Sequence, residues 1–481
     1  MTHISGTSRT QLLLLPERVD DYVGPDNTVR FIDAFVDGLD LKEAGFTRVQ
    51  SKSTGRPGYD PADLLKLYIY GYLNRIRSSR KLEVETHRNI ELIWLLRHLK
   101  PDFKTIADFR RDNRSCFKKV FREFVLLCRQ LDLFGRKLLA VDGTKIKAVN
   151  SKDNNFTRRS LTKMIKEADE RLDTYLKCLD EGDTGDVDRT RSENDQNLAE
   201  KINKIQIKQN RHKALLEELD RTDEGQVSLI DPDSRLMMGG STKHRVSYNV
   251  QIAVDCKHNL IVEQEVCNQG SDLGLLAKTA GPARSILGVD KIEVVADRGY
   301  YKIEDIEACE EENLVTYVSK PLRGSAVAAG YFSKDEFRFN EKEDCYICPA
   351  GKSLSTRYVG KLRENTTFTY CNRAACKICP LRSQCTNAAF RKVSRFENEA
   401  VLDRMAERLK KHPGMMTLRR CSVEHPFGSI KQWMNQGAFL TRRLENVRGE
   451  FSLTALAYNI RRALNLVGFK GLMAALRTQG A

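Results

Sequence analysis

Two short apolar runs, each followed directly by an aspartate, constrain this chain most. The run 138–141 precedes Asp142-Gly143, and the run 292–296 precedes Asp297-Arg298-Gly299. A short apolar run that meets a turn signal is typical of a buried strand. We therefore expect each carboxylate to project from the end of a strand. Taken singly, an aspartate before glycine is also ordinary turn chemistry.

A third acid, Glu424, has a helical rather than a strand-like setting. Apolar residues recur at helical spacing from Val423 to Met434, which predicts a helix packed against the sheet. Two strands and a helix can bring the three carboxylates together. Hard divalent cations such as Mg2+ prefer oxygen ligands, so three convergent acids can support a two-metal site for phosphodiester chemistry.

Three motifs carry these acids: Asp142 in its strand, Asp297-x-Gly-Tyr, and Arg420-x3-Glu424-x6-Lys431. Together they resemble the DDE transposases of bacterial insertion sequences, in the subgroup with a Tyr-x2-Arg-x3-Glu-x6-Lys signature. Thr417 stands where that signature has tyrosine, so the role of an aromatic residue there does not carry over. The segments 58–65 and 248–255 also resemble this family, so the likeness extends over nearly the whole chain.

The resemblance implies a ribonuclease H-like core and a DNA transposase. Asp142, Asp297 and Glu424 would hold Mg2+ or Mn2+ for cleavage at the element ends and for joining of the 3′-hydroxyl to target DNA. Arg420 and Lys431 would contact DNA. The implied partners are the terminal inverted repeats, target DNA and a second copy of the chain in a synaptic homodimer. Two alternatives stay open: a structure-specific nuclease on the same fold, and an inactive, domesticated transposase that only binds DNA.

Charge is consistent with a polyanionic partner. The chain of 481 residues has a formal net charge of +15. Residues 61–138 carry 18 Lys and Arg against 9 Asp and Glu, and residues 386–480 carry 17 against 7, whereas residues 151–230 carry 15 against 18. Affinity for DNA comes largely from phosphate neutralisation. Solvated helix faces are the equally simple alternative.

The sequence has no apolar stretch long enough to cross a membrane, and the run 12–15 is too short for the core of a signal peptide. We therefore expect a cytoplasmic, nucleoid-associated bacterial protein without a membrane partner. Thirteen cysteines in such a chain favour reduced thiols, with metal binding more plausible than disulfides where they cluster.

Six cysteines cluster between residues 344 and 386. Two pairs have Cys-x2-Cys spacing, which lets two thiolates reach one tetrahedral ion. The family pattern favours Cys348, Cys376, Cys379 and Cys385 as ligands of a structural Zn2+, with Cys345 as the alternative. Ordinary reduced cysteines in a β-rich insertion are the alternative.

Helical spacing and caps predict several short basic helices between residues 57 and 136. Asp60-Pro61 should open the first of them, and Thr105 should cap a later one. In a helix-turn-helix-like module, Arg110, Arg111 and Arg114 would lie on DNA phosphates or base edges. The alternative is a helical scaffold packed on the catalytic domain.

Two heptad patterns, 161–179 and 198–219, flank an acidic, glycine-containing segment at 180–188. They predict an antiparallel coiled-coil hairpin, with pairing between chains as the alternative. Beyond it, the alternating segments 248–255 and 260–266 predict a β-hairpin, and Asp272 is expected to cap the helix that follows.

Alternating strands and helices indicate an α/β chain. The predicted units are an N-terminal segment (1–56), a helical DNA-binding domain (57–136), a catalytic core (137–155, 226–335 and 395–440), a coiled-coil insertion (156–225), a Cys-rich zinc insertion (336–394) and a C-terminal helical segment (441–481).

Overall fold

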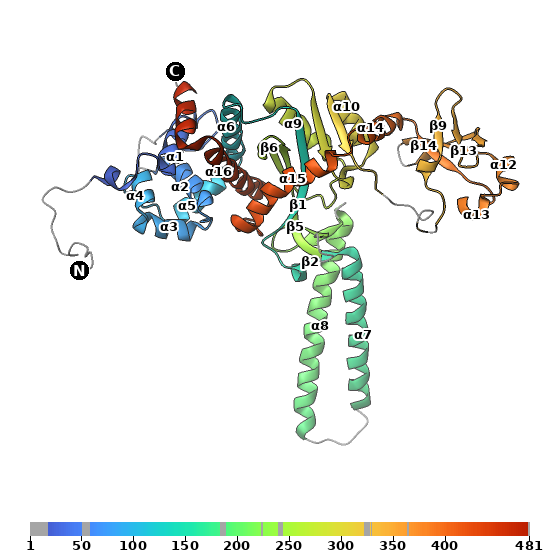
Figure 1. The fold of residues 1–481 in the computed structure, drawn as a ribbon. Coiled ribbons are helices and arrows are strands. Elements are labelled where there is room, and N and C mark those ends of the chain that lie inside the picture. Colours follow the sequence, from blue (N-terminus) through green and yellow to red (C-terminus); the bar gives the residue numbers. More distant parts are fainter. Residues whose placement is uncertain are drawn as a thin grey trace, which may run out of the picture.

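The computed structural model is a mixed α/β protein with helices at one end, a central sheet and a β-rich unit at the other end (Figure 1). Among the described residues, no helix is both long and apolar enough to cross a membrane. The structure describes residues 18–50, 58–182, 189–222, 225–238, 244–321, 328, 330–362 and 365–479.

The N-terminal end is helical, and its helix starts are set by side-chain caps. Asp60 accepts a hydrogen bond from the Ala62 amide at 2.8 Å, with Pro61 in the first turn, as predicted. The predicted cap Thr105 is wrong: the helix begins earlier, and Asp102 accepts from the amides of Lys104 and Thr105. The elements are η1 (Val19–Tyr22), α1 (Thr28–Asp37), α2 (Pro61–Leu73), α3 (Ser79–Arg88), α4 (Ile90–Leu95), α5 (Phe103–Asp112) and α6 (Cys116–Gln130).

A mixed sheet forms the centre of the molecule, in the order β4-β5-β1-β7-β8, with β6 also paired to β5. β1 is antiparallel to β5 and parallel to β7, which is in turn parallel to β8. The predicted hairpin at 248–266 is confirmed as β5 and β6. The strands are β1 (Leu138–Lys147), β4 (Arg235–Met238), β5 (His244–Asp255), β6 (Leu260–Cys267), β7 (Ile292–Ala296) and β8 (Leu314–Val318).

The expectation that the first strand ends at Asp142 is wrong. β1 continues to Lys147 because β5 pairs with it along the whole length, from Leu139 opposite Asp255 to Lys147 opposite Ser247. Asp142 therefore lies in the middle of a strand. Asp297, in contrast, directly follows β7 and opens the short helix η3 (Arg298–Tyr300), as the turn signal predicted.

Helices cover the sheet on both sides. α15 (Met415–Gly428) contacts β1, β7 and β5, while α9 (Leu276–Leu287) contacts β6, β5 and β1. The predicted cap Asp272 is wrong, because α9 starts at Leu276 and Asp305 accepts hydrogen bonds from the amides of Leu276 and Ala277. The other helices here are α10 (Ile303–Glu311), α14 (Ala400–Lys411) and the π-helical turn η5 (Ser429–Trp433).

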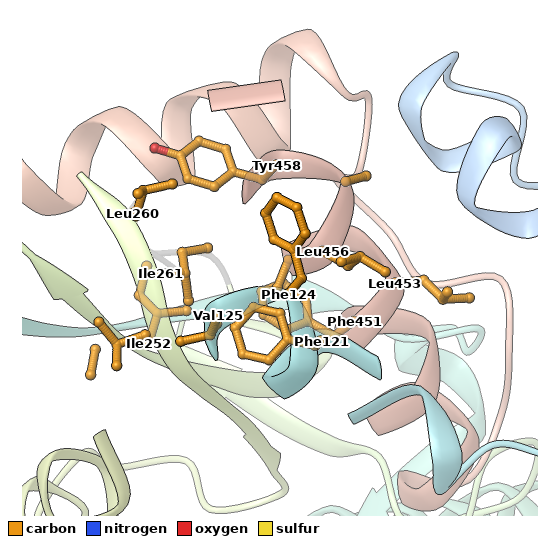
Figure 2. Packing of buried hydrophobic residues seen from close by; sticks show 14 of the residues in the cluster. Phe121, Phe124, Val125, Ile252, Leu260, Ile261, Phe451, Leu453, Leu456 and Tyr458 are labelled. Atoms are coloured by element: carbon orange, nitrogen blue, oxygen red, sulfur yellow. The ribbon is translucent and has the colours of Figure 1, made fainter. Parts of the chain in front are cut away.

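The C-terminal helix α16 (Leu444–Gln479), which kinks at Gly468, joins the helical end to the sheet. Figure 2 shows its apolar residues, including Phe451 and Leu456, facing Phe124 of α6 and Ile261 of β6. All four of these side chains are fully buried. This shared core fixes the N-terminal helices against the sheet.

Two long antiparallel helices, α7 (Arg158–Gly182) and α8 (Arg189–Arg221), project away from the sheet as an arm (Figure 1). Gln209 of α8 donates a hydrogen bond to Asp169 of α7, so the two helices pair within one chain. Part of the predicted tip, residues 183–188, lies outside the described residues. At the base of the arm, β2 (Asn155–Thr157) pairs with β3 (Gln226–Ser228).

The Cys-rich segment forms two small sheets with their own apolar cluster around Tyr346 and Tyr370. Its elements are β9 (Arg338–Asn340), β10 (Cys345–Ile347), β11 (Ser353–Leu354), β12 (Thr356–Leu362), β13 (Asn365–Cys371), α12 (Arg373–Lys377), α13 (Arg382–Cys385) and β14 (Val393–Phe396).

Phe124 provides a test of the core that α16 shares with α6 and β6. Its ring also packs edge-on against Phe31 and Phe35 of α1. Phe124→Ala should lower the free energy of unfolding by about 3–5 kcal/mol, since it removes buried area and leaves a cavity. Ile207→Ala, at a side chain that is 63% exposed on the arm, is the control and should change it by less than about 0.5 kcal/mol. Equal effects in a denaturant titration would contradict this assignment of the core.

Candidate active site

Two of the three predicted acids meet at the sheet. Because β1 and β7 are parallel neighbours, Asp142 in β1 lies beside Asp297, which follows β7. Each carboxylate is held by a nearby backbone amide: Gly143 donates to Asp142 at 2.9 Å, and Gly299 donates to Asp297 at 2.7 Å. The pairing of β1 with β7 and these two amides thus fix the positions of both carboxylates.

Arg419 of α15 joins these two acids. Its Nη2 lies 2.6 Å from Asp142 Oδ1 and 3.9 Å from Asp297 Oδ2. The Nε of Arg419 is buried and makes no hydrogen bond to the part of the chain that is described. Sequence reasoning missed this residue and chose its neighbour Arg420. The only available signal was that two arginines stand together one helical turn before Glu424.

The surroundings of Asp142 disfavour the ionised form of its carboxyl. Burial raises the pKa of its carboxyl to about 6; Arg419 opposes that rise, and the negative charge of Asp297 adds to it. Burial and a neighbouring negative charge both disfavour the ionised form of an acid. A cation near the two acids offsets both effects. Arg419 supplies the positive charge in this structure.

The third acid, Glu424, is placed differently. It lies on α15 as predicted, but it is exposed, and among the described residues it does not join Asp142 and Asp297 in a group arranged to hold a metal ion. Arg420 is also exposed. Lys431 is exposed as well, but its Nζ reaches the sheet and donates to Thr144 in β1. Burial lowers the pKa of Lys431, and the charge of Asp142 opposes that change.

The three arginines predicted to bind DNA from the helical end all have contacts within the chain. Arg110 lies over the Tyr68 ring, 5.6 Å from its centroid, which fits the scaffold interpretation. Arg111 pairs with Asp108 and Asp112. Arg114 pairs with Glu445 at the start of α16 at 2.6 Å and is 40% exposed.

Four cysteines line one small, mostly apolar cavity of about 30 Å3: Cys348, Cys376, Cys379 and Cys385. These are the four that the family pattern favoured. The alternative, Cys345, is buried in β10 away from this lining. Burial raises the pKa of the Cys385 thiol; Arg391 opposes this rise, and the other three cysteines add to it. The four thiols thus line the same cavity, and none of them is in a disulfide.

Neither site has a complete metal geometry. Within the described ranges, no group of three or more His, Cys, Asp or Glu side chains is arranged to hold a metal ion. The donor chemistry nevertheless fits. The paired carboxylates of Asp142 and Asp297, which already share one cationic nitrogen, suit a hard divalent cation. Four thiols around one small cavity suit Zn2+.

Two family models match parts of the chain. Residues 17–112 match a transposase domain (DUF772), and residues 347–464 match a transposase DDE domain, a range that contains Glu424 and the four cysteines of the cavity. No curated protein matches the chain. Among solved structures, a cryo-EM structure of the piggyBac transposase synaptic complex with hairpin DNA is 9% identical. The match covers 94% of this chain and 79% of that chain, with a TM-score of 0.34. A likeness at this level establishes neither a shared fold nor a shared function.

The raised pKa of Asp142 predicts a pH-dependent stability. A carboxyl whose pKa rises on folding contributes its full stability below about pH 4, and this contribution is lost as the pH rises through about 6. Asp142→Asn mimics the protonated form. In the presence of a chelator, its free energy of unfolding should equal that of the wild type near pH 4 and exceed it by about 1–3 kcal/mol at pH 8. A difference that stays constant from pH 4 to pH 8 in urea titrations would contradict this cause.

Proposed function

We propose that this chain is a DDE-type DNA transposase of an insertion-sequence family and that Asp142, Asp297 and Glu424 form its catalytic site. The observation that carries the proposal is the meeting of Asp142 and Asp297 around one nitrogen of Arg419. That arginine lies on α15, the helix within the matched DDE domain that also carries Glu424.

The central sheet, with acids on β1, after β7 and on α15, supports a ribonuclease H-like arrangement. In this arrangement β1 and β7 hold the two aspartates rigidly. Asp142, Asp297 and Glu424 would hold Mg2+ or Mn2+. When bound, the metal supplies activation of the attacking oxygen and stabilisation of charge at the phosphorus.

Arg419 and Lys431 balance charge at the site in different ways. Arg419 compensates the negative charge of the two aspartates, with its Nη2 2.6 Å from Asp142 and 3.9 Å from Asp297. Lys431 keeps an ammonium group beside Thr144, next to the acid-bearing position of β1. A cation there can hold a DNA phosphate close to Asp142. Arg420, which is exposed on α15, is proposed to bind the DNA phosphates that flank the cleavage site.

The proposed partners are the terminal inverted repeats of the element and target DNA, with a homodimer pairing the two ends. The basic segments 61–138 and 386–480 supply the charge for this binding. Such a substrate implies a cytoplasmic protein associated with the bacterial nucleoid. We further propose that α7 and α8 form a coiled-coil insertion and that the cysteine-lined cavity holds a structural Zn2+.

The function can be tested with DNA that carries the element's own ends and a supercoiled plasmid as target. With Mg2+, the wild type should cut the ends and join them to the plasmid. Asp297→Asn should lower both rates by at least about 1,000-fold while it still binds DNA, because it removes charge from the reacting site. Asp335→Asn, at an exposed acid that pairs with Lys320, is the control. Cleavage without joining would indicate a nuclease, and binding without either reaction would indicate a DNA-binding relic.

The zinc proposal has its own test, because Cys345 is the alternative ligand. Purified wild type should contain one Zn2+ per chain by elemental analysis. Cys379→Ser should lose most of this metal, since three thiolates do not close the coordination sphere. Cys345→Ser should retain it. Loss of zinc from the Cys345 variant alone would refute the proposed set of four ligands.

A further inference from the structure

Asp272 lies in the loop before α9, and one oxygen of its carboxylate accepts three hydrogen bonds from side chains. Its Oδ1 accepts from Lys145 Nζ at 3.0 Å, from Asn249 Nδ2 at 2.7 Å and from Gln251 Nε2 at 2.8 Å. Asn249 and Gln251 are both buried in β5. Since α9 is capped by Asp305, helix capping does not explain these contacts.

The donors show which side of the sheet Asp272 occupies. In the β1–β5 register, Gly143 is opposite Gln251 and Lys145 is opposite Asn249. Side chains alternate along a strand, so these positions face away from Asp142 and Thr144. Asp142 points toward Arg419 of α15, whereas Asp272 supports the same strand from its other face.

Two glycines beside the catalytic acids leave room for Asp272. A Cβ on Gly143 would lie 2.3 Å from Gln251 Nε2 and 2.7 Å from Asp272 Oδ1. A Cβ on Gly299 would lie 3.6 Å from Asp272 Oδ2. Gly143 follows Asp142, and Gly299 donates its amide to Asp297, so Asp272 approaches both segments that carry the acids.

Tyr300 completes the connection to Asp297. It belongs to η3, the turn that Asp297 opens, and its buried hydroxyl donates to Gln251 Oε1. Gln251 therefore accepts from Tyr300 through its Oε1 and donates to Asp272 through its Nε2, which links the turn after Asp297 to Asp272. Removal of the carboxylate charge would leave Lys145 without its ion-pair partner and would loosen Gln251.

We propose that Asp272 is a positioning residue for the catalytic site. From the face of β1 opposite Asp142, it holds Lys145, Asn249 and Gln251 and thereby sets the relative position of the segments carrying Asp142 and Asp297. This role rests on the proposed function, because those two acids are its proposed metal ligands. Outer groups that orient metal ligands commonly change metal affinity or activity by about 10–100-fold when mutated.

The test compares Asp272→Asn with Asp305→Asn in the full chain. The asparagine at 272 preserves size but removes the charge and presents an amide to three donors. Asp305 is a matched control: it is a buried aspartate that caps α9 and contacts neither catalytic acid. For each protein, Mn2+ affinity is measured without DNA by calorimetry, together with thermal unfolding, DNA binding, and end joining across a Mn2+ titration.

Asp272→Asn should bind Mn2+ about 10–100-fold more weakly and should need correspondingly more Mn2+ for joining, with DNA binding unchanged. Asp305→Asn should retain wild-type Mn2+ affinity even where its unfolding temperature falls. Wild-type Mn2+ affinity in Asp272→Asn would overturn the proposal, and so would equal losses in the two variants. If the wild type binds Mn2+ through Asp142 but joins no DNA, the proposed function fails, and the affinity comparison still decides the role of Asp272.

Discussion

The pairing of β1 with two different neighbours is the constraint on which the rest of the site depends. β5 runs antiparallel along the length of β1, and β7 runs parallel to its first part. This register places Asp142 in the middle of a rigid strand and brings Asp297 next to it. A long strand with buried neighbours on both sides cannot shift by one residue without turning its apolar face to solvent. The position of Asp142 is therefore a property of the whole sheet.

The two neighbouring acids require positive charge, which Arg419 supplies from α15. On the opposite face of β1, Lys145 forms a separate ion pair with Asp272. The helical end of the molecule supports α15 indirectly. Trp433, at the end of the following π-helical turn, lies between Arg75, 4.1 Å from its ring centroid, and Arg461, at 3.1 Å. These contacts connect the helical end and α16 to the turn that follows α15. Such a connection suits an enzyme that binds DNA and cuts it at a fixed position.

Local signals predicted much of the fold from sequence. The Asp60-Pro61 start, the β5–β6 hairpin and the strand before Asp297 all depend on neighbouring residues, and all are confirmed. Features set by distant partners could not be predicted. β1 continues past Asp142 because of pairing with β5, about a hundred residues later. Which of Arg419 and Arg420 faces the acids depends on the rotation of α15, and Asp272 acquires its role only from side chains on β1 and β5.

The most direct measurement is a structure of this protein with a cleaved element end and Mn2+, with the metal located by its anomalous scattering. We expect Mn2+ on the carboxylates of Asp142 and Asp297, with Glu424 brought to the same site and Arg419 displaced from Asp142. Mn2+ bound elsewhere, or an Arg419 that keeps its ion pair beside bound DNA, would show that these residues do not form the catalytic site.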